Sequence, residues 1–365
     1  MRVLALEVPR LRSLRAVALE LEAGIVSVVG ANGTGKTNLL EALHFALTGR
    51  SFRTGDRREL IPFGEPFARA EAVIADESGA RHRLLASVSR SEGRRHLLDG
   101  EGAEPAALAR HRPPIAVFSP DRLVLVKGPP AERRAELDRF AAIRWPSRAG
   151  LRQRFGQALA QRNALLARVN GGKASAGELD SWDEAVAAAA VPLIAARAEA
   201  VADLAARFAA AAADLGLGDS SAISYAPRAE GDEAALLEGL AERREADLRL
   251  GRTSWGPHLD EVQIATAGRA LRRYGSQGEQ RLALLALLFA EREALLAAGT
   301  GSPLLLLDDV MSELDPERRE RLGRRLSAGG QALITAAAVE ALPAAALEAV
   351  VDMPGARRAP SAVAA

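Results

Sequence analysis

Residues 24–49 read GIVSVVGANGTGKTNLLEALHFALTG: an apolar strand-like segment, a glycine-rich turn and a segment with helical spacing. The turn, residues 30–37, matches the pattern G-x-x-x-x-G-K-[ST] at every fixed position. Leu39, Leu43 and Leu47 recur at helical spacing, and Gly49 is a typical residue for ending a helix. The order strand, turn, helix is the context that this pattern requires. The stretch therefore predicts a phosphate-binding loop in an α/β fold.

Glycines in such a loop let successive backbone N–H groups turn inward at a helix start, where an anion is stabilised. We expect six residues to bind the phosphates of ATP in this way: Gly30, Ala31, Asn32, Gly33, Thr34 and Gly35. Lys36 is expected to contact the β- and γ-phosphates and to act in catalysis, and the Thr37 hydroxyl to bind Mg²⁺. Because the chain has 45 arginines and only three lysines, a lysine here favours this interpretation over a plain glycine-rich turn.

A second motif, PLLLLDDV at residues 303–310, places two acids at the end of an apolar strand-like run. Buried parallel strands deliver such side chains to the sheet edge where open α/β folds bind ligands. We expect Asp308 to hold Mg²⁺ beside Thr37, and Asp309 to orient the attacking water. Aspartate is shorter than glutamate, so slow turnover is expected. The alternative is a pair of acids that merely marks an exposed turn.

Lys36 and Asp308 lie too far apart in the sequence for one β–α–β step, so the nucleotide lobe must combine both ends of the chain. Residues 1–30 and 70–100 alternate like antiparallel strands, and the stretch after Pro129 has helical texture. We therefore predict an ATPase lobe in residues 1–128, an inserted helical lobe in 129–250, and completion of the ATPase lobe by 251–352. A disordered tail is expected in 353–365.

The stretch YGSQGEQR, residues 274–281, precedes another apolar helix-like run. A Ser-x-Gly turn at a helix start offers a hydroxyl and free N–H groups to an anion. The phosphate loop already supplies one such helix start, so the second would act on a nucleotide held by another copy of the chain. The alternative is an ordinary serine-capped helix.

Together these motifs resemble the ABC-type ATPases, and specifically the heads of the SMC group, whose signature turn is often Ser-Gly-Gly-Glu. Here Ser276, Gly278 and Glu279 match that turn. Further segments resemble the RecF family of bacterial recombination mediators: LTGRSFRT (47–54), FSPDRLVLVKGPPAERRAELD (118–138), GPHLDE (256–261) and LLLLDDVMSELD (304–315).

The resemblance implies an α/β fold with an ABC-type, SMC head-like P-loop ATPase lobe and an inserted helical lobe. It also implies an ATP-dependent homodimer with weak, DNA-stimulated ATP hydrolysis, the cofactors ATP and Mg²⁺, and a contact loop ending at Asp315. The implied partners are double-stranded, gapped or junction DNA, RecR and RecO, and indirectly RecA. The implied setting is cytoplasmic DNA repair, replication and the SOS response.

Three departures from the family pattern stand out. GPHLDE has Leu259 and Glu261 where the family more often has a basic residue and Asp, and Glu279 stands where Gln is common. No histidine follows His258, so the γ-phosphate sensor of many ABC proteins is missing, and Thr335 is the best substitute.

Composition adds few constraints. With no cysteine, disulfide and thiolate chemistry are excluded, and a net charge of +1 means that any DNA-binding surface must be local. The apolar run 282–290 is too short to cross a bilayer. Two arginine clusters could contact DNA, and we favour the first: Arg50, Arg53, Arg57 and Arg58; Arg243, Arg244, Arg249 and Arg252. Two other functions stay open: a transporter-type ATPase subunit, and a scaffold that binds ATP without hydrolysing it.

Overall fold

The computed structural model describes residues 1–91, 93–301 and 303–353. The chain forms two compact units. The first combines residues 1–122 with the chain after Ala294, and the second contains residues 123–294. The two ends of the sequence therefore share one unit, the arrangement that the distance between Lys36 and Asp308 predicts.

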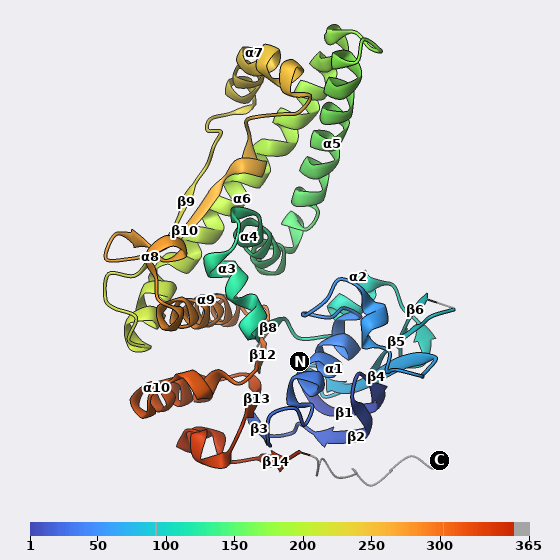
Figure 1. Ribbon diagram of the computed structural model, residues 1–365, viewed down its shortest axis with the longest axis vertical. Helices are drawn as coiled ribbons and strands as arrows, with labels where there is room; N and C mark the ends of the chain where they lie inside the picture. Colours follow the sequence, from blue (N-terminus) through green and yellow to red (C-terminus); the bar gives the residue numbers. More distant parts are fainter. Residues whose placement is uncertain (92, 302, 354–365) are drawn as a thin grey trace. The chain divides into compact units, whose positions relative to one another are not determined.

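The first unit contains a six-stranded antiparallel sheet with strand order β2-β1-β4-β5-β6-β7 (Figure 1). Alternating apolar residues turn one face of this sheet inward, as in β4, where every second side chain is buried. The strands are β1 (Arg2–Leu11), β2 (Leu14–Glu20), β4 (Phe67–Ala75), β5 (Arg81–Ser89), β6 (Gly93–Leu98) and β7 (Glu101–Gly102).

A parallel sheet with strand order β14-β3-β13-β12-β8 completes the first unit. Strands β3, β8, β12 and β13 of this sheet are buried along their whole length, as expected where both faces of a parallel sheet are covered. The strands are β3 (Ile25–Val29), β8 (Ile115–Phe118), β12 (Leu304–Leu307), β13 (Gln331–Ala336) and β14 (Val350–Asp352). Strand β14 is too short and too exposed to have a clear sequence pattern, and the sequence did not predict it.

Helix α1 (Lys36–Thr48) starts directly after the glycine-rich turn and joins the two sheets of this unit. It packs against β4 and β5 of the antiparallel sheet and against β13 of the parallel sheet (Figure 1). Leu39, Leu43 and Leu47 are fully buried in one hydrophobic core with residues of both sheets. Because α1 is packed in this shared core, the position of the glycine-rich turn at the edge of the parallel sheet is fixed. The remaining α-helices of the unit are α2 (Pro105–Arg110) and α10 (Pro316–Ser327).

The second unit is mainly helical and includes a three-stranded antiparallel sheet, β11-β10-β9. Its elements are α3 (Val124–Lys127), α4 (Pro130–Arg144), α5 (Leu151–Asn170), α6 (Leu179–Asp214), β9 (Ala222–Ala226), α7 (Glu233–Leu250), β10 (Glu261–Thr266), β11 (Arg269–Ala270), α8 (Leu271–Tyr274) and α9 (Gln277–Ala297), whose last residues continue into the first unit. The sequence did not predict β9, a short strand between two long helices.

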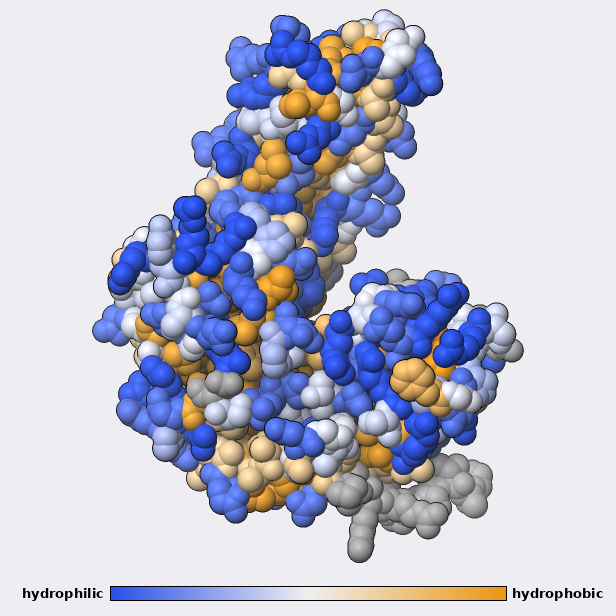
Figure 2. Space-filling model, viewed as in Figure 1, coloured by the Kyte–Doolittle hydropathy of each residue, from blue (hydrophilic) through white to orange (hydrophobic). Residues whose placement is uncertain are grey.

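Helix α6 is a core helix of the second unit. By length and composition, residues 176–214 could cross a membrane, but the core helix of a soluble protein passes the same test. Val186, Leu193 and Ala196 of α6 lie in a hydrophobic cluster with α5 and α7. Buried Asp183 and Arg197 make ion pairs within the unit. On the face drawn in Figure 2, the surface of this helical unit is mainly hydrophilic.

The compact units and the motif-based division of the chain differ in two places. Residues 123–128 and 251–294, including the signature turn, cluster with the helical unit, although the sequence motifs assigned them to the ATPase lobe. Of the predicted tail, Met353 is buried, and its backbone N–H donates to Val29 O over 2.7 Å. Residues 354–365 lie outside the described part of the chain.

Candidate nucleotide-binding site

The glycine-rich turn has the backbone geometry that a phosphate loop needs. Gly33 has φ +86° and Gly35 φ +101°, values that strain any residue with a side chain. A Cβ on Gly35 would also lie 3.1 Å from Leu14 Cδ2 and 3.2 Å from Ser13 Oγ. Thr34 Oγ1 donates a hydrogen bond to Ala31 O over 2.9 Å. The two glycines are therefore required for the turn that brings the backbone N–H groups to the start of α1.

Lys36 lies against the inside of this turn. Its side chain is buried, and Nζ donates to Gly30 O over 2.5 Å and to Ala31 O over 3.0 Å. These carbonyl oxygens are acceptors of the kind that a nucleotide phosphate provides, so they stand in for phosphate oxygens at the ammonium. The Lys36 ammonium is a compact charge with three donors that can rotate. It can therefore exchange a carbonyl acceptor for a phosphate acceptor while the loop keeps its conformation.

Asp308, Thr37 and Thr335 form one hydrogen-bonded cluster at the carboxyl edge of the parallel sheet. Thr37 Oγ1 lies 2.9 Å from both carboxylate oxygens of Asp308, and Thr335 Oγ1 donates to Asp308 Oδ1 over 2.9 Å. The strand order explains this meeting, because β13 lies between β3 and β12 with all three strands parallel. Asp308 and Thr335 are both buried.

Burial raises the pKa of Asp308 above its ordinary value. Hydrogen bonds from Thr335 and Thr37 and the charge of Arg53 oppose this rise, and neighbouring Asp309 adds to it. A buried carboxylate that is costly to ionise is stabilised when a cation binds it. Among the described residues, no group of three or more His, Cys, Asp or Glu side chains could hold a metal ion. Thr37 and Asp308 fit Mg²⁺, which commonly takes one or two protein ligands and completes its shell with water and phosphate.

Asp309 follows the metal-binding candidate in an unusual backbone conformation, with φ +48°. Its N–H donates to Thr335 Oγ1 over 2.9 Å, so the hydroxyl that contacts Asp308 also contacts the backbone of Asp309. Two buried side-chain oxygens at this edge have no hydrogen-bond partner among the described residues: Asp309 Oδ1 and Ser119 Oγ, just after β8. Buried acceptors without a partner are costly, so these atoms are available to a polar ligand.

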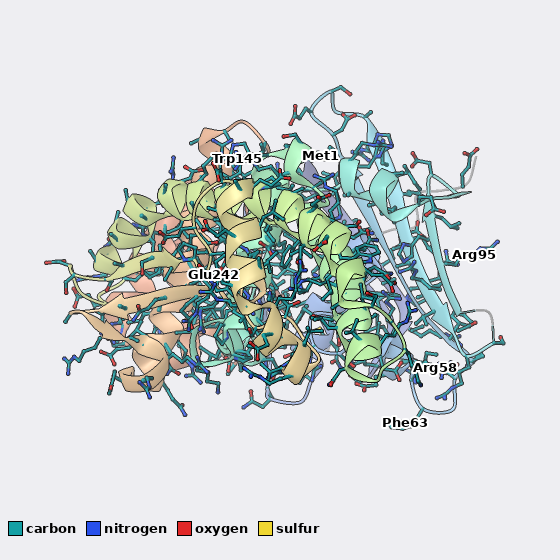
Figure 3. All side chains as sticks on the ribbon, turned by 90° about the horizontal axis from the view of Figure 1, so that it is seen from above. Met1, Arg58, Phe63, Arg95, Trp145 and Glu242 are labelled. Atoms are coloured by element: carbon teal, nitrogen blue, oxygen red, sulfur yellow. The ribbon has the colours of Figure 1, made fainter. Side chains whose placement is uncertain are left out.

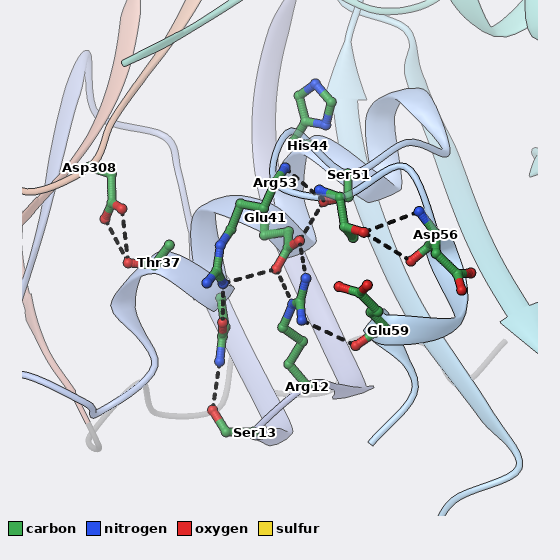
Figure 4. A network of polar contacts seen from close by, with 12 residues as sticks. Arg12, Ser13, Thr37, Glu41, His44, Ser51, Arg53, Asp56, Glu59 and Asp308 are labelled. Carbon is green, nitrogen blue, oxygen red and sulfur yellow. Dashed lines mark hydrogen bonds and ion pairs between the residues drawn. The ribbon is translucent and has the colours of Figure 1, made fainter. Parts of the chain in front are cut away.

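A second polar network holds α1 from its other side (Figure 4). Glu41 is fully buried and accepts hydrogen bonds from Arg12 Nη2 over 2.9 Å and from Ser51 Oγ over 2.5 Å. Arg53 lies 3.5 Å from Glu41 and donates to Asn38 Oδ1 over 3.1 Å. The network ties the segment LTGRSFRT to the helix that begins at the phosphate loop.

Sequence reasoning missed Glu41 and Ser119. A glutamate between Leu40 and Ala42, on the apolar face of the predicted helix, was a usable signal for a buried acid. Ser119 lies within the segment FSPDRL, but nothing in its local pattern distinguishes it from a surface serine.

The signature turn begins α9 in the second unit. Ser276 Oγ accepts from Glu279 N over 3.2 Å, and Glu279 Oε2 accepts from Ser276 N over 2.7 Å, a reciprocal capping box. Ser276 is thus the cap that the alternative interpretation expected, yet its hydroxyl hydrogen is still able to donate. Gly278 is exposed, and a Cβ there would meet only Ser276 Oγ at 4.0 Å.

Thr335 uses its hydroxyl on both acids, as donor to Asp308 and as acceptor from the Asp309 N–H. This geometry suits the positioning of both carboxylates, and contact between Thr335 and the γ-phosphate stays a prediction. Asp315 caps α10, where its Oδ1 accepts from Arg318 N over 2.9 Å.

The two arginine clusters differ in how their charges are used. In the second, Arg243, Arg244 and Arg249 each pair with an acid. In the first, only Arg53 has an ion pair within the part of the chain that the structure describes. Arg58 and Phe63, both labelled in Figure 3, are exposed residues of the first unit. The first cluster is therefore better placed to meet an external anion.

A glycine-rich loop between β3 and α1, paired acids directly after the parallel strand β12, and an inserted helical unit define an ABC-type ATPase head of the SMC group. The sequence matches the RecF/RecN/SMC N terminal domain family over residues 2–356. The Smc head domain of Pyrococcus furiosus shares this fold, with a TM-score of 0.58 and 18% identity over 96% of this chain and 93% of that one.

Within this class the chain belongs to the RecF family. It is 38% identical to the DNA replication and repair protein RecF of Myxococcus xanthus, over 92% of this chain and 90% of the relative. It is 39% identical to RecF of Anaeromyxobacter sp. (strain K), over 92% of both chains. A solved structure of the recombination mediator protein RecF-ATP in the RecFOR pathway matches with a TM-score of 0.81 and 25% identity, over 92% of both chains.

Proposed function

We propose that this chain is an ATP-dependent DNA-binding protein of recombinational repair, in which ATP closes two copies into a dimer. The observation that carries this proposal is the cluster of Thr37, Asp308 and Thr335 beside the phosphate loop. The cluster assembles a nucleotide half-site from distant parts of one chain. The signature turn, which begins a separate helix in the second unit, would supply the other half from a second copy.

Each side chain of the half-site has a separate task in the proposed reaction. The N–H groups of residues 30–35 and the Lys36 ammonium would bind the phosphates. Thr37 and Asp308 would hold Mg²⁺, which neutralises charge on the phosphates. Asp309 would orient the attacking water through its unpartnered Oδ1. Since an aspartate reaches less far than a glutamate, we propose weak hydrolysis that serves to release the dimer.

Relatives support the wider role. The two RecF relatives are named for DNA replication and repair, and the solved RecF structure is that of a recombination mediator with ATP in the RecFOR pathway. We propose that this chain binds DNA at gaps and junctions in the cytoplasm and acts with RecR and RecO to promote RecA loading. ATP would act as a switch, because a ligand can shift a monomer–dimer equilibrium only when the dimer binds it better.

The test is the mass of the particle in solution, measured by light scattering with ATP, with ADP and with a non-hydrolysable analogue. We expect dimers with ATP and its analogue and monomers with ADP, and gapped DNA should accelerate phosphate release. A protein that stays monomeric in every nucleotide would contradict the proposal. ATP-induced dimers without measurable hydrolysis on DNA would instead favour a non-hydrolysing scaffold.

A matched pair of variants makes the test specific. Ser276→Arg should abolish the ATP-dependent dimer and leave ATP binding to single subunits intact, because Ser276 belongs to a different helix from the phosphate loop. Ser175→Arg is the control: Ser175 is another exposed serine in a capping box, with Glu178, in the same unit. If both variants lose the dimer equally, the effect comes from damaged caps and not from the signature turn.

A further inference from the structure

The second unit contains a basic pocket of about 520 Å³, between α3, α4, α8 and the strands β10 and β11. Six polar residues line it: Lys127, Arg133, Glu261, Gln263, Arg272 and Arg273. Lys127 is one of the three lysines of this arginine-rich chain and lies in a segment that resembles the RecF family. The ATP half-site described above uses none of these residues.

One ion pair forms the rigid floor of the basic pocket. Arg133 is buried and lies 2.6 Å from the Glu261 carboxylate. Its remaining donors meet backbone carbonyls, with Nε 2.6 Å from Val262 O and Nη1 3.0 Å from Gly128 O. Arg133 therefore neutralises Glu261, the one acid among the described residues that line the pocket, and backbone carbonyls of two segments fix its position.

Three cations of the pocket have no acid of their own. Lys127, Arg272 and Arg273 are exposed, and none has an ion pair within the described ranges 1–91, 93–301 and 303–353. Other arginines of the same unit are paired, such as Arg139 with Glu136 and Glu291. These three positive charges around one pocket create a local positive potential that attracts a polyanion. The potential is local, because the whole chain has a net charge of only +1.

We propose that the basic pocket binds backbone phosphates of duplex DNA, and that this contact acts on the signature turn. The proposal rests on the proposed function and deepens it, because it places the DNA contact and its link to the nucleotide. Phosphate contacts position a protein on DNA without reading its sequence, which suits a protein that recognises a DNA structure.

The link to the signature turn is short and hydrogen-bonded. Arg272 and Arg273 lie on α8, which ends at Tyr274, just before Ser276. Buried Gln280, in the first turn of α9, donates through Nε2 to Leu271 O over 3.0 Å and to Gly275 O over 3.1 Å. One side chain therefore ties both ends of α8 to the helix that Ser276 caps. Phosphates held by Arg272 and Arg273 would restrain α8 and, through Gln280, the signature turn.

The binding step is tested with labelled gapped duplex DNA by fluorescence anisotropy over a range of salt concentrations. Each phosphate contact contributes about 0.9 to the slope of log K against log salt, so Arg272→Glu/Arg273→Glu should lower that slope by about two. Lys127→Gln, a milder change, should lower it by about one. The control is Arg154→Glu/Arg168→Glu, which changes the net charge equally at exposed positions of α5.

Unchanged affinity and slope in the pocket variants, relative to this control, would overturn the proposed site. If the unmodified chain binds no duplex DNA at all, the proposed function itself fails. The two failures are therefore distinguishable in one titration. Circular dichroism of each variant identifies any loss caused by misfolding.

The coupling step is tested with Gln280→Met, which removes both hydrogen bonds and nearly keeps the side-chain volume. We expect this variant to retain DNA affinity and to lose the stimulation of ATP hydrolysis by DNA. Arg272→Glu/Arg273→Glu should lose affinity and stimulation together. Full stimulation in the Gln280→Met protein would overturn the link between the basic pocket and the signature turn.

Discussion

At the scale of single residues, the Thr335 hydroxyl connects the two acids of the nucleotide site. It donates to Asp308 Oδ1 and accepts from the Asp309 N–H, each over 2.9 Å, and it is fully buried. A hydroxyl that is both donor and acceptor can hold two neighbouring residues in different orientations. One side chain thus contacts both the metal-binding candidate Asp308 and the water-orienting candidate Asp309.

Replacing Thr335 by valine keeps the shape and removes this connection. We expect Thr335→Val to destabilise the chain by about 1–3 kcal/mol, because it leaves a buried N–H and a carboxylate oxygen without this partner. ATP hydrolysis should fall more than ATP affinity, since the variant misplaces Asp309, which we propose to orient water, and leaves the phosphate loop unchanged. Thr335→Ser, which retains the hydroxyl, is the control. Hydrolysis and affinity that fall in parallel would argue against a positioning role.

The raised pKa of Asp308 gives a second prediction at this scale. An acid whose pKa is higher in the folded chain than in the unfolded chain binds more protons when folded. Ionising Asp308 therefore lowers the free energy of unfolding as pH rises through its folded pKa. Without nucleotide, Asp308→Asn should therefore raise the free energy of unfolding at pH 7, and the gain should shrink as pH falls toward the ordinary aspartate range. The same variant should lose Mg²⁺-dependent ATP binding. Denaturant titrations at several pH values measure the first effect, and a gain that grows toward acid pH would contradict it.

At the scale of elements, the residues that cap the N-terminus of α9 also belong to the signature turn. Ser276 and Glu279 exchange hydrogen bonds across the first turn. The hydrogen bond from the Ser276 backbone is the main cause that lowers the pKa of Glu279. The same geometry that closes the helix end therefore fixes the orientation of the serine, and the exposed Gln277 and Gly278 leave room for a ligand.

Glu279 offers a test of the cap apart from the signature. A lowered carboxylate pKa contributes stability above the ordinary value, and this is lost as pH falls through the folded value. Glu279→Ala should cost about 1 kcal/mol or less at pH 7, because the side chain is only half-buried. Glu279→Gln should retain the cap and remove this part of the acid dependence. Thermal unfolding between pH 3 and pH 7 measures both, and an equal loss in the two variants would contradict the capping role.

At the scale of the whole molecule, the two units differ in the contacts that stabilise them. The first unit is held by the shared hydrophobic core around α1. The second contains a buried ionic cluster, in which Arg162 meets Asp183 over 2.6 Å and Asp247 and Thr253 over 2.7 Å. Arg162 and Asp247 are fully buried. The residues expected to bind the nucleotide therefore differ from the residues that stabilise the second unit.

This difference predicts two transitions in calorimetry. Arg162→Met removes the ion pairs of Arg162 with two buried carboxylates, of which Asp183 keeps Arg244 and Asp247 keeps no cation among the described residues, and should destabilise the second unit by about 3–5 kcal/mol. Mg²⁺-ATP should raise only the transition of the first unit, in the variant as in the unmodified chain. Arg249→Met is the control, since its exposed pair with Glu245 contributes little. Equal shifts of both transitions in the Arg162→Met protein would show that the units unfold together.

Much of the site could be predicted because its chemistry is contiguous in the sequence. Residues 30–37 carry every fixed position of the phosphate loop, and Asp308 and Asp309 follow an unmistakable apolar run. The double role of Thr335 could not be predicted, because it depends on β13 lying between β3 and β12. The buried role of Glu41 depends on Arg12 and Ser51, which reach it from two other segments. The basic pocket joins residue 127 to residues 261–273, which no local pattern relates.

The sequence by itself determined the local elements of this protein: the phosphate loop, the acidic strand, the serine-started helix and the helical texture of the insertion. Each of these elements depends on residues that are close in the sequence, within one turn or strand. Their backbone preferences and hydrophobic periodicity can be recognised from the sequence alone. Only the tertiary structure decided which of these elements meet. Strand order is set by how apolar faces pack against one another over the whole chain, so it alone brought Thr37, Asp308 and Thr335 together and left Lys127, Arg272 and Arg273 around one pocket.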